Sequence, residues 1–526
     1  MPRTKHSQSG EVSTDSIKKS LSKAFNPPVA HHEVIIIGAG FSGLGAAIKL
    51  DQAGFNDFLI IEQGSGVGGA WHFNTYPGVA VDIPSLSYSF SFERNPNWSR
   101  LFAPGEELKG YAEHCVEKYK LGDRIRYNTT VMGCEFDEDT NCWHIRTQDG
   151  KVLSARFMIG ATGVLTQPKK PDIAGVDNFK GTTMHTARWD HSVSLRNKRV
   201  AVIGTGASAL QVIPEIAPDV KHLTVFQRTP IWVIPKPDAS IPSVLQKVLE
   251  KSNAVQWASR MVSQAVVEVG FVLTAHYHKY LKLAKAYEAI ALNHLEKQVK
   301  DPVTRAKLTP KYGFGCKRPS ASNTYWATFN RDNVALVTDP IASIDEKGVI
   351  TKDGKHHEID VLICATGFKV FENGNMPPFP MKGLGGKDLE GWWDNNRYQA
   401  YEGVTVPGFP NAFLILGPNG YNGASYFQLI EMQARHIVRC LKQARKLKAE
   451  RVEVKQLANQ KYFDDMKART GSQVFFLNGC TSANSYYFDK HGDVPFRPAT
   501  SIEAHWRSMT FPMKDYSFST VAKQAG

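Results

Sequence analysis

The sequence predicts an α/β protein with two Rossmann-like dinucleotide-binding domains and a helical insertion in the second one. The first observation behind this prediction is a β-branched apolar run that leads into a glycine-rich loop at two places in the chain. The second is a charged residue that closes each unit at the same distance from its loop. The third is apolar spacing of the helical kind between residues 241 and 308.

The first glycine-rich loop follows residues 34–37, a run of valine and isoleucine that is typical of a strand buried on both faces. Gly38 allows a tight turn, Gly40 lets a pyrophosphate approach the backbone, and Gly43 lets the next helix pack on the strand. That helix opens at the loop, beside Ser42, where free N–H groups and the helix dipole favour an anion. We therefore predict a nucleotide site at this loop.

The second glycine-rich loop follows residues 200–203 and has the same order of strand, loop and helix. Its helix carries Pro214, so we expect that helix to end early or to kink. Contacts to a second nucleotide are expected from Gly204, Thr205, Gly206, Ser208 and Ala209.

The residue that closes each unit distinguishes the two nucleotides. Glu62 follows the second strand of the first unit, 24 residues after Gly38, where a carboxylate accepts hydrogen bonds from ribose hydroxyls and repels a 2′-phosphate. Arg228 stands 24 residues after Gly204, and its planar guanidinium suits a 2′-phosphate. We therefore predict FAD in the first unit and NADPH in the second. An exposed arginine on a solvated strand end is the alternative for Arg228.

Composition excludes several other classes of protein. The chain has 526 residues, 42% hydrophobic and 21% charged, as expected of a globular protein with two or three domains. Its net charge is +13, but the basic residues are spread along the chain and form no nucleic-acid-binding module, so we predict no nucleic-acid partner. The 17 histidines show no metal-ligand spacing, and we predict no metal. No apolar run is long enough to span a bilayer, and residues 265–275 predict a buried helix.

The cysteines and the N-terminus bear on the cellular location. Seven cysteines without a CxxC or CxxxxC pair argue against a disulfide framework and favour a reducing compartment, so we expect a cytoplasmic protein. The missing pair also argues against a disulfide reductase, which shares the two-nucleotide layout but needs a redox-active dithiol. The first thirty residues are rich in serine and lysine, and we interpret them as a flexible extension. A weakly amphipathic targeting or membrane-touching segment is the alternative.

The two nucleotide units predict interleaved domains. Two Ala-Thr-Gly turns, at residues 161–163 and 365–367, each follow an apolar strand and mark where we expect the chain to cross between domains. The predicted divisions are a flexible extension at 1–30, a FAD-binding domain at 31–165 and 371–526 that includes the C-terminal segment, an NADP-binding domain at 166–240 and 334–370, and a helical insertion at 241–333.

A longer motif lies between the two loops. Residues 179–190 read FKGTTMHTARWD and match FxGxxxHxxxW(P/D), the fingerprint of the type I Baeyer–Villiger monooxygenases, at every specified position. The chain resembles that family over nearly its whole length after residue 31. We interpret His185 and Trp189 of the fingerprint as structural residues at the domain crossover, where they help couple domain movement to turnover.

The resemblance implies a flavin monooxygenase that uses FAD, NADPH and O2 to insert one oxygen atom beside a ketone carbonyl, giving an ester or a lactone. In that family a C4a-peroxyflavin attacks the ketone and gives a Criegee intermediate. Arg318 matches the family's active-site arginine, whose permanent charge would favour the peroxide anion and the Criegee oxyanion. Asp82 matches an aspartate near the flavin edge, which would orient Arg318. An unrelated surface arginine and a turn aspartate are the alternative.

The resemblance also implies further cofactor contacts. Lys317 matches the lysine that joins Arg228 at the 2′-phosphate. Trp71 and Tyr88 match flavin-packing positions, with ordinary aromatic core as the alternative. Tyr486 departs from the family, because many members have a tryptophan there that caps the nicotinamide side. The remaining expected cofactor contacts are Gly69, Val131 and Thr229.

Two other functions stay open from the sequence. A sister flavin monooxygenase would oxidise nitrogen or sulfur in soft nucleophiles, a reaction that uses a protonated hydroperoxide and needs no arginine opposite it. An NADPH oxidase or a redox-responsive flavoprotein would bind both nucleotides without oxygenating a substrate. The presence of both Asp82 and Arg318 favours the ketone reaction. The sequence predicts no particular ketone and no oligomeric state.

Overall fold

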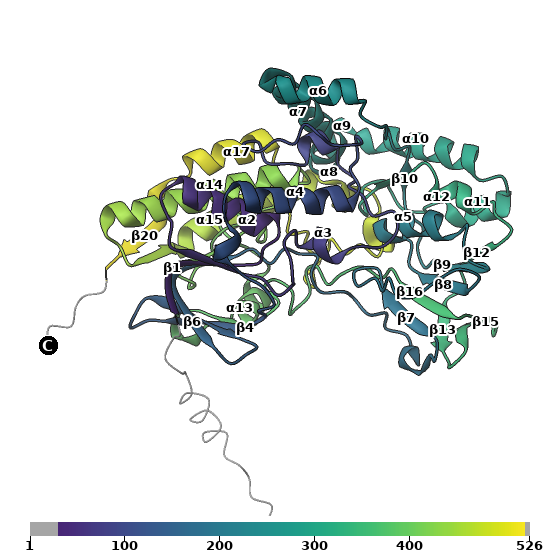
Figure 1. The fold of residues 1–526 in the computed structure, drawn as a ribbon, viewed down its shortest axis with the longest axis horizontal. Helices are drawn as coiled ribbons and strands as arrows, with labels where there is room; N and C mark the ends of the chain where they lie inside the picture. Colours follow the sequence, from purple (N-terminus) through teal and green to yellow (C-terminus); the bar gives the residue numbers. More distant parts are fainter. Residues whose placement is uncertain (1–29, 521–526) are drawn as a thin grey trace, which may run out of the picture.

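A computed structural model describes residues 30–520, so the expected N-terminal extension lies almost entirely outside the described residues. Figure 1 shows two sheets at the two ends of an elongated molecule, with helices along one side of both. A further group of helices, α6 to α9, lies on the outer side of this helical layer. The space between the two sheets is where the predicted cofactor residues have to meet.

The first sheet is built from both ends of the chain. β1 (Ala30–Ile37) lies between β2 (Phe58–Ile61) and β6 (Val152–Gly160) and is parallel to both. β18 (Ala412–Leu414) pairs with the last residues of β6, so a strand from far down the chain completes the sheet. The other strands are β3 (Ile125–Arg126), β4 (Val131–Asp137), β5 (Cys142–Thr147) and β17 (Met381–Lys382), in the order β17-β4-β5-β6-β1-β2-β3.

Two long helices pack together over this sheet (Figure 1). α2 (Phe41–Gln52) begins at the first glycine loop, and α14 (Tyr426–Leu447) lies against it, with the rings of Phe41 and Phe427 4.5 Å apart. α14 buries its apolar side in this contact, as an amphipathic surface helix does, whereas α2 is buried on almost every side. The contact ties the N-terminal nucleotide unit to the C-terminal part of the chain.

The second sheet has five parallel strands in the order β12-β9-β8-β16-β7. α5 (Ala207–Ile216) begins at the second glycine loop and ends two residues after Pro214, which confirms the early end expected from the proline. The strands are β7 (Thr182–His185), β8 (Arg199–Ile203), β9 (His222–Phe226), β12 (Val334–Val337) and β16 (Val361–Cys364), and an antiparallel sheet of β13 (Ile341–Ile344), β14 (Gly348–Thr351) and β15 (His356–Glu358) follows β12.

Residues 243–308 are almost entirely helical, as their apolar spacing predicts. The short strands β10 (Val233–Ile234) and β11 (Ser320–Ala321) pair in parallel and bring the two ends of this region together. The helices are α6 (Ser243–Lys251), α7 (Asn253–Val267), the π-helical turn η4 (Glu268–Leu273), α8 (Thr274–His276), α9 (His278–Leu281), α10 (Leu283–Gln298) and α11 (Pro302–Leu308).

The prediction of a buried helix at residues 265–275 is wrong for one side of that helix. Val267 and Val272 are buried, but Val266 and Val269 are 58% and 46% exposed. Apolar spacing identifies a helix without showing which of its faces meets the core. An apolar face of α7 and η4 therefore lies in solvent.

The remaining elements surround the two sheets. Within residues 30–520, no helix combines the length and the apolar character that a membrane crossing requires. The other helices are α3 (Ala70–Phe73), α4 (Gly105–Lys118), α12 (Tyr325–Thr328), α13 (Leu389–Asn396), α15 (Gln456–Ala468), α16 (Val474–Leu477) and α17 (Ser501–Thr510), and β19 (Arg451–Val454) pairs antiparallel with β20 (Tyr516–Ser519).

Both glycine loops lie against a carbonyl group of an Ala-Thr-Gly turn. Gly38 has a φ of +110°, and a Cβ at this position would lie 2.6 Å from the carbonyl oxygen of Ala161. Gly204 repeats the arrangement, with a φ of +111° and a distance of 2.4 Å to the carbonyl oxygen of Ala365. Only glycine tolerates both this backbone angle and this close approach. Each turn thus packs on a glycine loop at the point where the chain leaves one sheet for the other.

We predict that Gly43→Ala lowers the free energy of unfolding by about 1–3 kcal/mol, because overpacking displaces α2 from β1. A Cβ at Gly43 would lie 1.8 Å from the carbonyl oxygen of Gly38. Chemical denaturation followed by circular dichroism measures the change.

Gly110→Ala is the matched control for this substitution. Gly110 lies inside α4, and nothing lies within 4 Å of its Cβ position. Alanine at this position should raise the free energy of unfolding by about 0.5–1 kcal/mol. Equal stability of the two variants would contradict close packing at Gly43.

Candidate active site

Arg318 and Asp82 meet from distant parts of the chain. Asp82 lies in the loop between α3 and the 3-10 turn η1 (Ser85–Ser87), and Arg318 lies two residues before β11. Arg318 Nη2 donates a hydrogen bond to Asp82 Oδ1 over 2.6 Å. Arg318 Nε is buried and has no hydrogen-bond partner. The site therefore holds a cation in a fixed position, with one N–H group that makes no hydrogen bond within the described part of the protein.

Two opposing effects act on the pKa of Arg318. Burial has the largest single effect and lowers this pKa by penalising the charged guanidinium. Attraction to the Asp82 carboxylate, together with smaller contributions from the neighbouring tyrosines, raises it by more in total, so the pKa lies well above that of a free arginine. Burial also raises the pKa of Tyr421 and Tyr487, which lie beside Arg318 and stay neutral. Arg318 is therefore a cation at every pH at which the protein functions.

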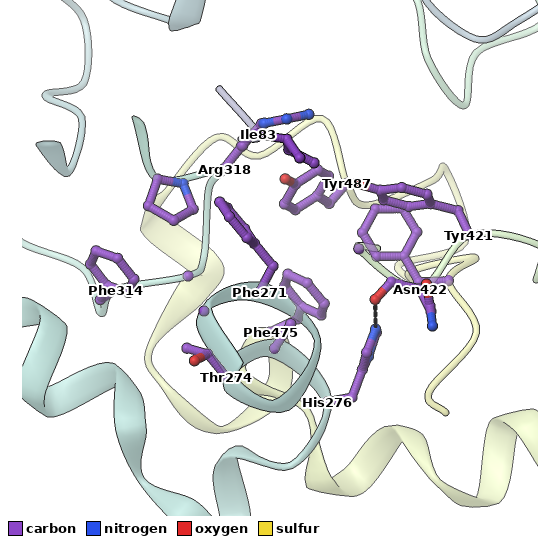
Figure 2. A pocket seen from close by; sticks show the side chains of 16 residues that line it. Ile83, Phe271, Thr274, His276, Phe314, Arg318, Tyr421, Asn422, Phe475 and Tyr487 are labelled. Carbon is purple, nitrogen blue, oxygen red and sulfur yellow. Dashed lines mark hydrogen bonds between the residues drawn. The ribbon is translucent and has the colours of Figure 1, made fainter. Parts of the chain in front are cut away.

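Arg318 lies on the wall of a pocket that several aromatic side chains line (Figure 2), termed the aromatic pocket. Figure 2 shows Phe271 and Phe475 below the arginine, with Tyr487 and Tyr421 to its side. These rings come from η4, α16 and two loops of the C-terminal part of the chain. An apolar pocket with a single cation suits a small uncharged molecule that carries a polar oxygen.

Hydrogen bonds hold the Asp82 loop against α5. Tyr76 Oη donates to Gln211 Oε1 over 2.7 Å, and Gln211 Nε2 donates to the carbonyl oxygen of Ala80 over 2.9 Å. A Cβ at Gly78 would lie 2.9 Å from the carbonyl oxygen of Gln211, so the loop and the helix are in close contact. Because α5 begins at the second glycine loop, the second nucleotide unit positions the loop that carries Asp82.

The first glycine loop has the features that FAD needs. α2 begins at Gly40 with no side-chain cap and no acidic residue in its first turn, which leaves its first N–H groups for a phosphate. Glu62 accepts hydrogen bonds from the N–H groups of Ala39 and Gly64, each over 2.7 Å, and these bonds fix its carboxylate at the end of β2. The carboxylate oxygens keep lone pairs for a ribose hydroxyl.

The other residues predicted for FAD lie around this loop. Gly69 packs on the first glycine loop, and Ser42 is buried in the first turn of α2. Trp71 and Tyr88 meet edge to face with ring centroids 5.8 Å apart. Val131 is buried at the start of β4. The structure thus gathers the predicted glycines and aromatic side chains on one side of the first sheet.

The second glycine loop has matching features. α5 begins without a side-chain cap, and the Cβ position of Gly206 faces open space. Thr205 Oγ1 donates to the carbonyl oxygen of Thr229 over 3.0 Å, and Asn484 Nδ2 donates to Thr229 Oγ1 over 3.2 Å. The second bond brings the loop that carries Tyr486 to this nucleotide unit. The other predicted contacts in this loop and the first turn of α5 are Gly204, Ser208 and Ala209.

Lys317 and Arg228 bring two cations together. Burial lowers the pKa of Lys317, and repulsion from Arg228 lowers it further, to about 8. Two neighbouring cations repel each other unless an anion lies between them. The pair therefore fits the 2′-phosphate that the sequence predicts at Arg228.

One disulfide corrects the interpretation of the cysteines. The sequence argues against a disulfide framework, but Cys316 and Cys480 are bonded across a separation of 164 residues. A search for local pairs such as CxxC does not detect a bond that the tertiary fold creates. The bond ties the residue before Lys317 and Arg318 to the loop that leads to Tyr486. It therefore joins two segments that carry predicted site residues.

The fingerprint residues lie outside the aromatic pocket. His185 ends β7, and its Nδ1 accepts a hydrogen bond from the N–H group of Ala187 over 3.0 Å. Trp189 is partly buried against the core, and Asp190 accepts hydrogen bonds from the N–H and hydroxyl groups of Ser192. Their place on the crossover between the sheets supports the structural interpretation.

Sequence reasoning missed four residues that shape the site. Gln211 lies on α5, and nothing in the sequence shows that it bonds to the Asp82 loop. Phe271 belongs to a helical region whose apolar spacing does not mark a pocket wall. Tyr421 and Tyr487 come from loops, although the position of Tyr487 directly after Tyr486 is a signal that could have indicated an aromatic wall.

Comparison with known proteins bears on the identity of the chain. A family model described as pyridine nucleotide-disulphide oxidoreductase matches residues 35–289, which include both glycine loops but neither bonded cysteine. A Baeyer–Villiger monooxygenase of Pseudomonas aeruginosa is 38% identical over 473 residues, which cover 88% of each chain. The chain belongs to the Baeyer–Villiger monooxygenase family.

Solved structures agree with this membership. The cyclohexanone monooxygenase from Rhodococcus sp. Phi1 bound to NADP+ superposes with a TM-score of 0.84 at 28% identity, covering 94% of this chain and 100% of that one. OTEMO in complex with FAD and NADP gives a TM-score of 0.81 at 26% identity, covering 94% and 100%. These findings confirm the resemblance and the predicted α/β fold with two Rossmann-like domains.

We predict that kcat/KM for NADPH falls about tenfold or more as the pH rises through the pKa of Lys317, which is about 8. The loss follows because Lys317 gives up the proton that attracts the 2′-phosphate, and kcat/KM reports the free enzyme. NADH lacks this phosphate, so its kcat/KM should not follow the same pKa. Stopped-flow flavin reduction across pH measures both values.

Lys317→Met is the control for this pH dependence. This variant should have a low kcat/KM for NADPH at every pH, so the fall of kcat/KM near pH 8 should disappear. Its kcat/KM for NADH should equal that of the wild type. If kcat/KM for NADPH still fell with rising pH in the Lys317→Met protein as it does in the wild type, a group other than Lys317 would be responsible.

Proposed function

We propose that this protein oxidises a ketone to an ester or a lactone in the pocket beside Arg318, with FAD and NADPH as cofactors and O2 as the oxidant. The observation that carries this proposal is the partly buried ion pair between Arg318 and Asp82 at a pocket that several aromatic side chains line. Membership of the family supports the reaction, and the position of the ion pair supports the choice of site.

The two glycine loops fit the two cofactors. When bound, the reduced flavin supplies one oxygen atom from O2, and NADPH supplies the electrons. Glu62 would bind a ribose of FAD, and the N-terminus of α2 would bind its pyrophosphate. Arg228 and Lys317 would bind the 2′-phosphate of NADPH.

Arg318 would stabilise the negative charge that develops on oxygen while the ketone carbonyl is attacked. Its guanidinium is always charged, because the carboxylate of Asp82 holds its pKa high. Its Nε–H group has no hydrogen-bond partner among residues 30–520, and the guanidinium would donate to an oxygen of the reacting ketone. Asp82 would act as a positioning residue that fixes the plane of the guanidinium.

The aromatic walls would keep water away from the reacting atoms. Phe271, Phe475 and Tyr487 face the same pocket as Arg318. A cation stabilises a nearby anion more strongly in such a low-dielectric surrounding than in water. Oxidation of nitrogen or sulfur creates no oxyanion on a substrate carbon, so it would give Arg318 no developing negative charge to stabilise.

We predict that Arg318→Ala lowers kcat for ketone oxygenation by at least about 100-fold, because it removes the charge that stabilises the oxyanion. Flavin reduction by NADPH should persist, since Glu62, Arg228 and Lys317 are unchanged. Product analysis by gas chromatography measures the first quantity, and stopped-flow absorbance measures the second.

Arg228→Ala is the matched control, because it removes an arginine from the other end of the predicted cofactor site. It should raise KM for NADPH and keep ester formation at saturating NADPH. Ester formation at the wild-type rate by the Arg318→Ala protein would refute the proposed role of Arg318. A wild-type protein that oxidises sulfides but no ketone would favour the alternative monooxygenase, and NADPH consumption without any product would favour an oxidase.

A further inference from the structure

One long face of α7 is both apolar and exposed. Its solvent-facing positions recur every three or four residues, which is the spacing of one side of a helix. The side chains between the larger ones are alanines, and no charged side chain interrupts the stripe. The large exposed residues are Trp257, Met261, Val262 and Val266 of α7 and Val269 of η4.

The side of α7 that faces the protein is mainly polar apart from Val267, which reverses the usual pattern of a surface helix. Arg260 and Ser263 are buried there. Arg260 Nη1 donates to the carbonyl oxygen of Ser89 over 2.8 Å. The helix is therefore attached through polar contacts, and its apolar face has no partner among residues 30–520.

A second apolar stripe lies beside the first. α17 exposes Ile502, Trp506 and Met509, again at helical spacing. The two stripes are joined at one end, because the N–H group of Ser501 donates to Glu268 Oε1 over 3.0 Å. In Figure 1, α6, α7 and α17 lie along the same edge of the molecule. The exposed apolar residues of α7, η4 and α17 are termed the apolar edge.

Basic residues predominate on the helices next to α7 and η4 in the chain. The exposed charged side chains between residues 243 and 285 are five lysines and one glutamate, namely Lys247, Lys251, Lys279, Lys282, Lys285 and Glu250. Lysine attracts the phosphates of anionic headgroups, and tryptophan is enriched where headgroups meet acyl chains. The edge thus pairs apolar anchors with positive charge.

We propose that the apolar edge docks on the surface of a lipid bilayer that contains anionic lipids. The tryptophans and aliphatic side chains would enter the boundary between headgroups and acyl chains, and the lysines would contact the headgroups. A second copy of the chain could also cover the apolar residues. In a two-fold dimer, however, the same lysines would face each other and repel.

The apolar edge continues into the wall of the aromatic pocket. Val269 is exposed, and the next two residues, Gly270 and Phe271, line the pocket. One turn further, Thr274 and Ala275 line it as well. A bilayer at this edge would place the pocket beside the phase in which an apolar ketone dissolves. This consequence for the substrate rests on the proposed function, whereas docking itself does not.

Co-sedimentation of the FAD-loaded protein with vesicles tests the proposal. The wild type should sediment with mixed phosphatidylcholine–phosphatidylglycerol vesicles and bind pure phosphatidylcholine vesicles more weakly. Added salt should weaken binding to the mixed vesicles, because it screens the lysines.

Val262→Glu and Val303→Glu form a matched pair of variants. The two valines are 67% and 63% exposed, but Val303 lies on α11, away from the apolar edge (Figure 1). Val262→Glu should lower the partition coefficient for mixed vesicles by at least about tenfold, because it places a negative charge among the apolar anchors. Val303→Glu should bind as the wild type does. Flavin absorbance shows that both variants are folded and hold FAD.

A wild-type protein that stays in the supernatant with mixed vesicles would overturn the proposal, as would equal binding by the two variants. A dimer in solution that Val262→Glu dissociates, without vesicle binding, would assign the apolar edge to a second copy and would also overturn it. None of these readouts involves ketone oxidation. Failure of docking and failure of the proposed reaction are therefore distinguishable.

Discussion

The ion pair between Arg318 and Asp82 is the contact on which the rest of the site depends. A guanidinium that is largely removed from water is destabilising unless an acid lies beside it, and here the acid comes from a residue 236 positions away in the sequence. Further contacts therefore fix the two segments that carry these side chains. Tyr76 and Gln211 fix the loop of Asp82 against α5, and a disulfide fixes the segment that carries Arg318. The result is a cation with a defined position on the wall of the aromatic pocket.

The helical region between residues 243 and 308 connects that pocket to the outside of the molecule. α7 and η4 form one continuous stretch of helix, and its end supplies Phe271 to the pocket wall. The rest of the same stretch presents its apolar face to solvent and buries Arg260 against the first sheet's loops. A single element thus contributes both to the chamber where the substrate would react and to the surface from which an apolar substrate would arrive.

Local patterns in the sequence predicted much of the fold. Residues 34–37 form the expected strand and residues 243–308 the expected helices, because apolar runs and helical periodicity depend on neighbours in the chain. The glycine loops likewise determine the start of α2 and α5. The approach of Arg318 to Asp82 was implied by resemblance to a family and not by spacing. Two features could not be predicted. The disulfide joins residues that only the tertiary fold brings together, and periodicity alone does not show which face of α7 meets the core.

The pairing of β18 with β6 has a consequence for synthesis on the ribosome. All strands of the second sheet lie between residues 182 and 364, so that sheet can close while the later part of the chain is still inside the ribosome. The first sheet begins earlier but stays incomplete until residue 414 has emerged, and α2 cannot pack on α14 until residue 447 follows. The unit translated first is thus the last to be finished. A premature stop in the final quarter of the message would leave the N-terminal nucleotide unit with exposed apolar surface for chaperones and proteases.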